Sequence, residues 1–264
     1  MFAAMKRRDG LRQKPPPSDK PVPDKPVPAK PVPAKPVPDK PVPAKSVPTK
    51  PVKGVRKKRI LDAAEALFAH HGFDGVTMRQ IASRADVDVA LASYHFGNKQ
   101  DLFEAVMFRR SLPMNDVRQK ALDDCLAAAA PGAPTVEDLI DITLKPLFGS
   151  EERQDEGWRH YYELVAYVNN SAEWGEKLME KLFGDLRANY LAAYKKALPD
   201  ADEKDIFWCY HFMSGAIALT MAQTGRINHY SGGLCSAQDL HGAYERMVPF
   251  ITAGFEKLCE TPKA

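Results

Sequence analysis

The hydrophobic and polar positions follow a helical period along most of the chain after residue 55. The first such segment, which begins at residue 56, is RKKRILDAAEALFAHHGF. Its apolar residues recur at intervals that place them on one helical face; they are Ile60, Leu61, Ala64, Leu67 and Phe68. Gly72 follows, a residue type that commonly ends helices. The pattern predicts an amphipathic helix with one buried face.

Two shorter helices are predicted next. Thr77 with Gln80 three residues later forms a capping box, which marks a helix N-terminus. Asp88 is a good N-cap for a further helix over residues 89–96. Between them, Asp86 stands where a tight turn favours left-handed geometry, which Asp tolerates better than most residues. A long helix followed by two short ones predicts a helix-turn-helix in a three-helix domain, with residues 89–96 entering a DNA major groove.

Residues 103–264 read as helices throughout. We expect breaks at Pro113 and at residues 131–134, 149–157, 199 and 225–233. Residues 174–194 carry apolar side chains at steps of four, and residues 240–258 form a last amphipathic helix. Residues 205–224 are apolar on almost every side, which requires a partner chain or a ligand against one face.

The N-terminal segment has a different character. Residues 20–52 repeat with a period of five, as in KPVPD and KPVPA, and most of the 22 prolines lie there. Such a segment forms a polyproline II rod or a disordered tail. Three uses remain open: a spacer, a lysine tether for DNA phosphates, and a docking segment for a partner that recognises P-x-x-P.

Charge supports a polyanionic partner at the front of the chain. The net charge of +3 combines a strongly basic segment over residues 1–54 with an acidic segment over residues 103–264. A polyanion such as DNA would therefore meet the N-terminal part.

Several other protein classes are disfavoured. The chain has no G-x-S-x-G, phosphate-binding glycine loop or H-E-x-x-H motif, so we expect no enzyme and no cofactor. His160 with Glu163 and His241 with Glu245 have chelating spacing, but two ligands are too few for a metal site. Widely spaced cysteines, no long apolar run and no secretory signal favour a cytoplasmic protein with reduced thiols.

The end of the predicted recognition helix carries side chains suited to a DNA backbone. Ser93, Tyr94 and His95 offer hydroxyl and imidazole donors, and Lys99 adds a positive charge at the start of the next helix. The alternative is that the aromatic residues are core. We expect that for Phe96, which should pack on the first helix, and leave both interpretations open for His95.

These residues match a known pattern. The motifs I-L-x-A-A-x-x-L-F, G-x-x-x-x-T-M-x-x-I-A and Y-H-F-x-x-K-x-x-L-F resemble the DNA-binding domain of the TetR family of bacterial transcription regulators. The resemblance implies DNA-facing positions at Thr77, Arg79, Val89, Ala90, Ser93, Tyr94, His95 and Lys99, and we add Arg56 from the basic stretch before them. Many members have Leu-Tyr at Ala92-Ser93, so one aromatic phosphate contact is missing here. The apolar Val89 and Ala90 would favour thymine methyl groups.

For the C-terminal part, the resemblance implies a four-helix dimer interface and a ligand pocket between the middle helices. The stretches FWCYHFMSGAIALTM and MVPFITAG further resemble TetR-type regulators of fatty-acid metabolism. The candidate pocket residues are aromatic, Met or His: Phe148, Trp158, Tyr162, Tyr167, Met179, Phe183, His211, Phe212, Met213 and Met221. They would suit a small apolar effector, such as a long-chain acyl group or a lipophilic drug. His211 would either bind a carboxylate or thioester or be a buried core histidine.

The sequence therefore predicts an all-α chain with three parts: a disordered tail (1–53), a helix-turn-helix domain (54–102), and a ligand-binding and dimerisation domain (103–264). The predicted function is a homodimeric repressor that binds a double-stranded DNA operator and is released by its effector. The alternatives are an activator or architectural DNA binder that uses the tail, and a partner-docking protein without specific DNA reading.

Overall fold

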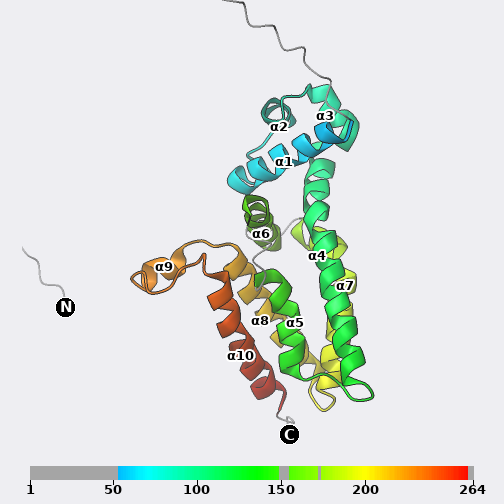
Figure 1. Ribbon diagram of the computed structural model, residues 1–264, viewed down its shortest axis with the longest axis vertical. Coiled ribbons are helices and arrows are strands. Elements are labelled where there is room, and N and C mark those ends of the chain that lie inside the picture. Colours follow the sequence, from blue (N-terminus) through cyan, green and yellow to red (C-terminus); the bar gives the residue numbers. More distant parts are fainter. Residues whose placement is uncertain (1–52, 149–154, 172–173, 261–264) are drawn as a thin grey trace, which may run out of the picture. The chain divides into compact units, whose positions relative to one another are not determined.

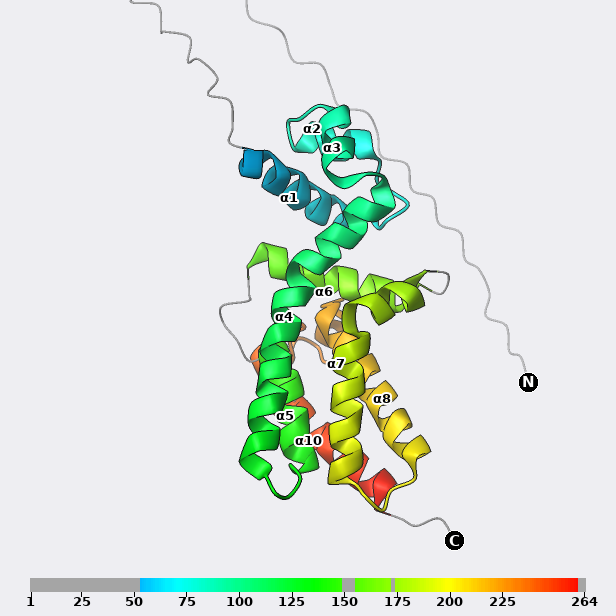
Figure 2. The same ribbon diagram turned by 90° about the vertical axis from the view of Figure 1, so that its right-hand side faces the viewer.

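The computed structural model describes residues 53–148, 155–171 and 174–260, and these residues form ten α-helices and no strand. The predicted tail lies outside the described residues, except for Lys53, which begins the first helix. The helices, shown in Figures 1 and 2, are α1 (Lys53–His71), α2 (Met78–Arg84), α3 (Val89–Phe96), α4 (Lys99–Ala129), α5 (Val136–Phe148), α6 (Glu156–Asn169), α7 (Gly175–Ala197), α8 (Glu203–Met221), α9 (Arg226–Tyr230) and α10 (Leu240–Cys259). None of them is long and apolar enough to cross a membrane.

Helices α1, α2 and α3 pack against one another and against the start of α4. Their shared core contains side chains with no exposed surface, namely Phe68, Ile81, Ala92 and Phe103. The predicted caps are confirmed: the Thr77 hydroxyl accepts from the Gln80 N–H, and the Asp88 carboxylate accepts from the Ala90 N–H at 2.7 Å. Asp86 has the expected positive φ of 50°. The three-helix domain is thus built from local signals and one small core.

The predicted break at Pro113 is wrong, because α4 continues through it. A proline inside a helix removes one backbone hydrogen bond and costs about 3 kcal/mol. The neighbouring Ser111 and Met114 are fully buried, and α4 packs on α5 and α7. Burial on both sides of the proline outweighs the lost bond, so the helix extends over 31 residues.

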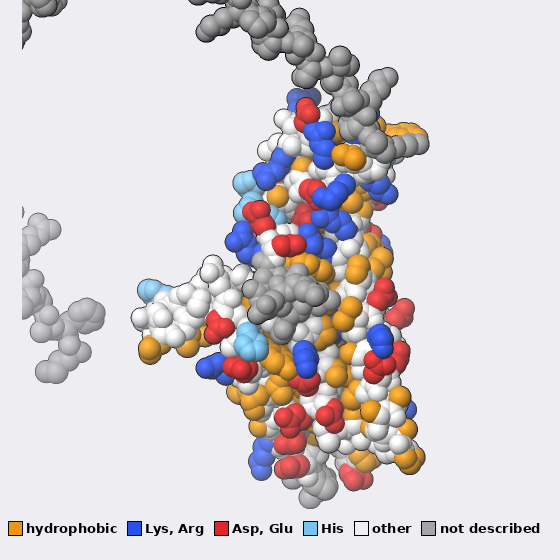
Figure 3. All heavy atoms as spheres, in the orientation of Figure 1, with side chains coloured by type: hydrophobic (Ala, Val, Ile, Leu, Met, Phe, Trp, Pro, Cys, Tyr) orange, Lys and Arg blue, Asp and Glu red, His pale blue; other side chains and the backbone are white. Residues whose placement is uncertain are grey.

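Helices α5, α7, α8 and α10 pack with α4 to form the C-terminal part. The apolar series predicted over residues 174–194 faces this core, since Leu178, Leu182, Leu186, Tyr190 and Tyr194 are all buried. The Tyr190 hydroxyl donates to the Arg118 carbonyl at 3.0 Å, which ties α7 to α4. In the view of Figure 3, Lys and Arg side chains are frequent around α1, and Asp and Glu are frequent over the ends of α4, α5 and α10.

The outer face of α8 is apolar and exposed in the single chain. The sequence predicts that a partner chain or a ligand covers one face of this helix. Trp208, Phe212 and Leu219 are exposed there, although other α8 residues such as Met213 are buried. Helix α10, which packs on α8, exposes Phe250. This face of the chain has the composition of a protein interface.

Candidate DNA-binding surface and ligand pocket

Helix α3 has one buried and one exposed side. Ala92 and Phe96 face the core, and the ammonium of Lys57 on α1 lies 5.5 Å from the centre of the Phe96 ring. The prediction that Phe96 packs on the first helix is therefore confirmed. The exposed side carries Val89, Ala90, Ser93 and Tyr94, with His95 half-buried at its edge. Tyr94 is 77% exposed, which excludes a core role for this aromatic ring.

The DNA-binding candidates on α1 and at the start of α2 differ in how free their side chains are to contact another molecule. Arg79 is exposed and takes part in no ion pair within the described part of the chain. The Thr77 hydroxyl is engaged in the capping box, where it donates to the Gln80 side chain at 2.8 Å. Arg56 is half-buried in the first turns of α1. A ligand on this surface would meet free donors on α3 and on Arg79.

Lys99 has a partner within the protein. Its ammonium donates to the Phe73 carbonyl at 2.9 Å and lies 4.2 Å from the centre of the Phe73 ring. These contacts fasten the start of α4 to the loop after α1. An ammonium has three donors, so contact with a second acceptor is still stereochemically available. The sequence carried no signal of this structural contact.

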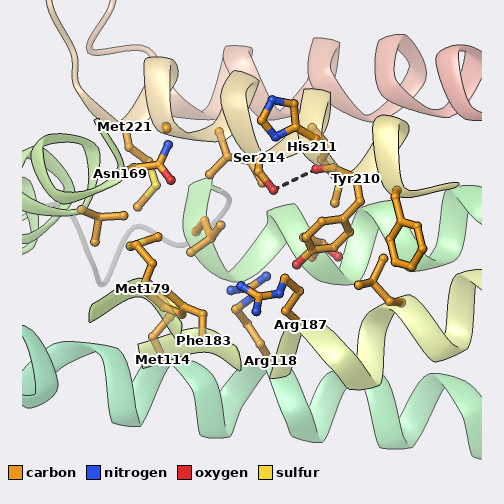
Figure 4. A pocket seen from close by; sticks show the side chains of 18 of the residues that line it. Met114, Arg118, Asn169, Met179, Phe183, Arg187, Tyr210, His211, Ser214 and Met221 are labelled. Atoms are coloured by element: carbon orange, nitrogen blue, oxygen red, sulfur yellow. Dashed lines mark hydrogen bonds between the residues drawn. The ribbon is translucent and has the colours of Figure 1, made fainter. Parts of the chain in front are cut away.

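A cavity of about 470 Å³ lies among α4, α5, α6, α7 and α8 (Figure 4). Five of the predicted ligand residues line it, namely Met179, Phe183, His211, Met213 and Met221. His211 is exposed, so the idea of a buried core histidine is wrong. Its ring lies 5.7 Å from that of Trp208 on the outer face of α8. It therefore sits at the edge of the cavity.

The other five predicted residues do not line this cavity. Phe148 is buried in the core, the Trp158 ring packs under the Arg110 guanidinium, and the Tyr162 hydroxyl donates to the Leu147 carbonyl. Tyr167 packs beside Trp174, and Phe212 is 60% exposed. For the two residues on α6, the reason is the orientation of the helix about its own axis. On α6 the cavity-facing residues are Tyr161, Val165 and Asn169, at steps of four, and Trp158 and Tyr162 occupy the neighbouring face.

Polar residues that the sequence analysis missed also line the cavity; they are Arg118, Thr143, Asn169, Arg187, Tyr210 and Ser214. Arg118 is only 9% exposed, and its Nε has no hydrogen-bond partner. The spacing in the sequence does indicate that Arg118 is buried, because position 118 lies four residues from both Met114 and Leu122, which are buried. Burial raises the pKa of Tyr210, and the Arg118 and Arg187 guanidinium groups oppose that rise.

Helix α6 also contacts α1, so the cavity wall touches the three-helix domain. At this junction the His160 ring lies 5.1 Å from that of His70, and its Nε2 has no hydrogen-bond partner. Burial lowers the pKa of His160 below its ordinary 6.5, with His70 acting in the same direction. Glu163, Glu156 and Glu65 act in the opposite direction but do not overcome burial.

The lowered pKa of His160 predicts acid sensitivity. The unfolded chain takes up a proton near pH 6.5, whereas the folded chain resists it. Stability from this group is therefore complete above pH 6.5 and decreases as the pH falls through the lower folded pKa. Urea unfolding midpoints measured between about pH 7 and pH 5 should fall less for His160→Gln than for the parent chain. Equal slopes in both proteins would contradict this assignment.

The described residues contain no group of three or more His, Cys, Asp or Glu side chains that could hold a metal ion. Among the described residues, the surface of α3 and the cavity carry side chains that could bind another molecule. The surface of α3 combines exposed hydroxyl and apolar groups with a half-buried imidazole. The cavity combines an apolar lining with one buried and one half-buried arginine, Arg118 and Arg187.

Both the N-terminal three-helix domain and the C-terminal helices match families of known proteins. Residues 60–106 match the family described as bacterial regulatory proteins, tetR family, and residues 141–254 match the tetracyclin repressor-like C-terminal domain. The regulator YvkB of Bacillus subtilis is 36% identical over 153 residues, which cover 57% of this chain and 76% of YvkB. The regulator BetI of Agrobacterium fabrum is 29% identical over 148 residues, which cover 56% of this chain and 68% of BetI.

Among solved structures, SmeT, the repressor of the Stenotrophomonas maltophilia multidrug efflux pump SmeDEF, has the same fold. It aligns with a TM-score of 0.53 at 22% identity over 75% of this chain and 88% of SmeT. A SmeT–triclosan complex aligns with a TM-score of 0.50 at 21% identity, over 75% of this chain and 91% of that one. With both family matches and the similarity to YvkB, this chain belongs to the TetR family of helix-turn-helix transcription regulators.

Proposed function

We propose that the protein is a homodimeric repressor that binds a double-stranded DNA operator through α3 and leaves it when a small molecule enters the cavity. The observation that carries the DNA-binding part is the exposed side of α3. Val89, Ala90, Ser93 and Tyr94 are exposed on a short helix whose opposite side is held by Ala92 and Phe96 in the core. A helix presented in this way fits a major groove.

The α3 side chains divide into two roles in this proposal. Val89 and Ala90, near the N-terminus, contact base edges and favour thymine methyl groups. Ser93 and Tyr94 donate hydrogen bonds to phosphates, and the free Arg79 adds a charged contact from α2. Residues 54–102 form the DNA-binding domain, and residues 103–264 bind the effector and the second copy. The repressor acts in the cytoplasm, where bacterial DNA lies.

The second copy is supported by the exposed apolar face of α8 and α10, which carries Trp208, Phe212 and Phe250. A two-fold dimer places two α3 helices on half-sites separated by about one helical turn of DNA, roughly 34 Å. The dimer face and the cavity share α8, because Phe212 lies outside and Met213 inside. An effector that displaces α8 or α6 would therefore alter the separation of the two DNA-binding domains.

The effector proposal rests on the lining of the cavity. Its side chains are mostly apolar and include Met114, Met179, Met213 and Met221, which adapt to the shape of a ligand. That lining supports a molecule with a substantial apolar part, an acyl chain among them. SmeT, which has the same fold, has been solved with triclosan. Release from DNA requires only that the effector bind the DNA-incompetent state more tightly.

The operator is found by selecting bound fragments from random DNA with the purified full chain. On the selected operator, Tyr94→Ala should lower affinity about 10-fold or more, because a hydrogen bond to a charged phosphate is lost. Its thermal unfolding should not change, since Tyr94 is 77% exposed. The matched control is Tyr230→Ala, because Tyr230 on α9 is 75% exposed but lies outside the DNA-binding domain.

Two results would contradict the DNA-binding proposal. One is a selection that recovers no preferred sequence. The other is a Tyr94→Ala variant that binds the operator as tightly as the parent chain does. Either would favour a partner-docking protein. Adding Tyr94→Phe separates the hydroxyl from the ring: if the hydroxyl carries the phosphate contact, the Phe variant should resemble Ala in affinity.

A further inference from the structure

We propose that the effector is an acid: an amphipathic molecule whose carboxylate binds Arg118, with an apolar body against the methionine-rich side of the cavity. This inference rests on the proposed function of the cavity as an effector site, and it specifies the chemical class of the molecule. Neutral lipophiles and neutral acyl esters are thereby disfavoured.

The first observation is the state of Arg118. Its side chain is buried with 9% exposure, lines the cavity and has an Nε without a hydrogen-bond partner. No carboxylate of the described residues forms an ion pair with it, although the neighbouring α4 acid Asp124 pairs with Lys120. Burying a guanidinium without an opposite charge is unfavourable. Among the described residues, the Arg118 guanidinium therefore has no anionic partner, and an anion in the cavity would stabilise it.

The groups around Arg118 do not supply that anion. Its guanidinium lies 5.5 Å from the centre of the Tyr190 ring, a contact with a neutral aromatic group. Burial raises the pKa of Tyr190 and of Tyr210, so both phenols remain neutral near pH 7. The Arg118 charge opposes those rises, and so does a side-chain hydrogen bond between Arg118 and each phenol. Neutral hydroxyls solvate a cation but do not balance its charge.

A second guanidinium strengthens the case. Arg187 on α7 lines the same cavity, and Figure 4 shows it beside Arg118, with Tyr210 of α8 nearby. Both guanidinium groups oppose the rise in the pKa of Tyr210, so two positive charges lie near its hydroxyl. Arg187 is also paired with Glu180 at the exposed rim. A carboxylate at this point would bind Arg118 directly and reduce the repulsion between the two guanidinium groups.

The rest of the cavity limits the ligand to an amphipathic molecule. Beyond the arginines the lining is dominated by apolar side chains such as Met114, Phe183 and Met213. The cavity of about 470 Å³ is in the size range that holds drug-sized ligands. A small inorganic anion would leave most of the apolar lining in contact with water. A carboxylate with an apolar body satisfies both halves of the site.

The test measures binding to the free full chain with matched acid and alcohol pairs: dodecanoate with dodecan-1-ol, and 2-naphthoate with 2-naphthol. Isothermal titration below the concentrations at which these molecules aggregate gives each dissociation constant. At least one acid should bind about 10- to 100-fold more tightly than its alcohol, as expected for a charge-assisted bond. Arg118→Met should abolish that preference but keep the affinity for the alcohol.

Two controls separate recognition from folding. Lys120→Met removes an exposed α4 cation paired with Asp124 and should leave the acid preference unchanged. The ligand-free Arg118→Met variant should unfold at a temperature equal to or above that of the parent chain, because an unbalanced buried charge has been removed. Its backbone carbonyl still accepts from the Tyr190 hydroxyl.

The proposal is overturned if no acid binds, if the alcohols bind as tightly as the acids in both pairs, or if Arg118→Met retains the preference. These outcomes do not depend on DNA. A chain that binds acids through Arg118 but recognises no operator would contradict the repressor function alone. A chain that binds an operator but prefers alcohols would contradict only the acid.

Discussion

Replacing Phe212 with Glu should convert the protein from a dimer to a monomer and weaken operator binding by at least about 100-fold. Phe212 is 60% exposed on α8, and its ring stacks on that of Trp208 with centroids 5.6 Å apart. Phe250 on the adjoining α10 is 76% exposed. Exposed apolar side chains on two helices that pack together are characteristic of a surface that another chain covers.

Symmetry amplifies the effect of the charge. In a two-fold dimer one substitution places a carboxylate in both copies of the same patch, where each loses water and meets an apolar or like-charged surface. The two DNA-binding domains then act separately. Since a linked second half-site raises affinity by a factor of about 10² to 10⁴, its loss accounts for the expected weakening.

Sedimentation gives the oligomeric state, and titration of the selected operator gives the affinity. Leu112→Glu is the matched control, because Leu112 is an apolar residue of α4 that is 54% exposed but lies outside the face made by α8 and α10. It should remain a dimer. A parent chain that sediments as a monomer, or a Phe212→Glu variant that remains a dimer, would refute the assignment of this face.

Local signals in the sequence predicted the N-terminal domain well. The capping box at Thr77, the N-cap at Asp88 and the positive φ of Asp86 each depend on a few neighbouring residues. Such interactions are the same in any fold that contains the turn. The helix break predicted at Pro113 is wrong because it was inferred from the local sequence alone. The packing of α4 on helices distant in the sequence decides whether the helix continues.

The cavity was harder to predict because it depends on how each helix is rotated. The aromatic ring of Tyr162 predicts a cavity contact, but Tyr161, one residue earlier and about 100° around the helix, faces the cavity. The sequence does not predict Arg118 as a cavity residue, because a charged residue in a polar stretch usually lies at the surface. Its four-residue spacing from Met114 and Leu122 places it on the buried face, and only tertiary structure shows that it has no acidic partner among the described residues.

Replacing Glu65 with Ala should destabilise the folded chain by about 3 kcal/mol, the largest effect expected from a single side chain outside the apolar core. Glu65 on α1 is 3% exposed. Its carboxylate accepts hydrogen bonds from Arg110, including one at 3.1 Å from Nη2, and from Arg109 Nη2 at 3.1 Å. The variant leaves two largely buried guanidinium groups without this shared partner, although Arg109 keeps Asp62 at 2.7 Å.

The same carboxylate links three helices. The Arg110 guanidinium lies between Glu65 of α1 and the Trp158 ring of α6, 5.1 Å from the ring centre. Helix α6 lines the cavity with Tyr161, Val165 and Asn169. Loss of Glu65 should therefore also reduce the effect of a bound effector on operator affinity, since the path from α6 to α1 loses its charged contact.

Urea unfolding followed by helical circular dichroism, at equal protein concentrations, measures the stability change. Lys58→Ala is the control on the same helix: it removes an exposed pair with Asp62 and should cost no more than about 0.5 kcal/mol. Glu65→Gln should fall between the two, because the amide oxygen still accepts a hydrogen bond but carries no charge. If Glu65→Ala and Lys58→Ala have the same unfolding midpoint, the buried cluster contributes no more than a surface pair, and its role in joining α1 to α4 and α6 is refuted.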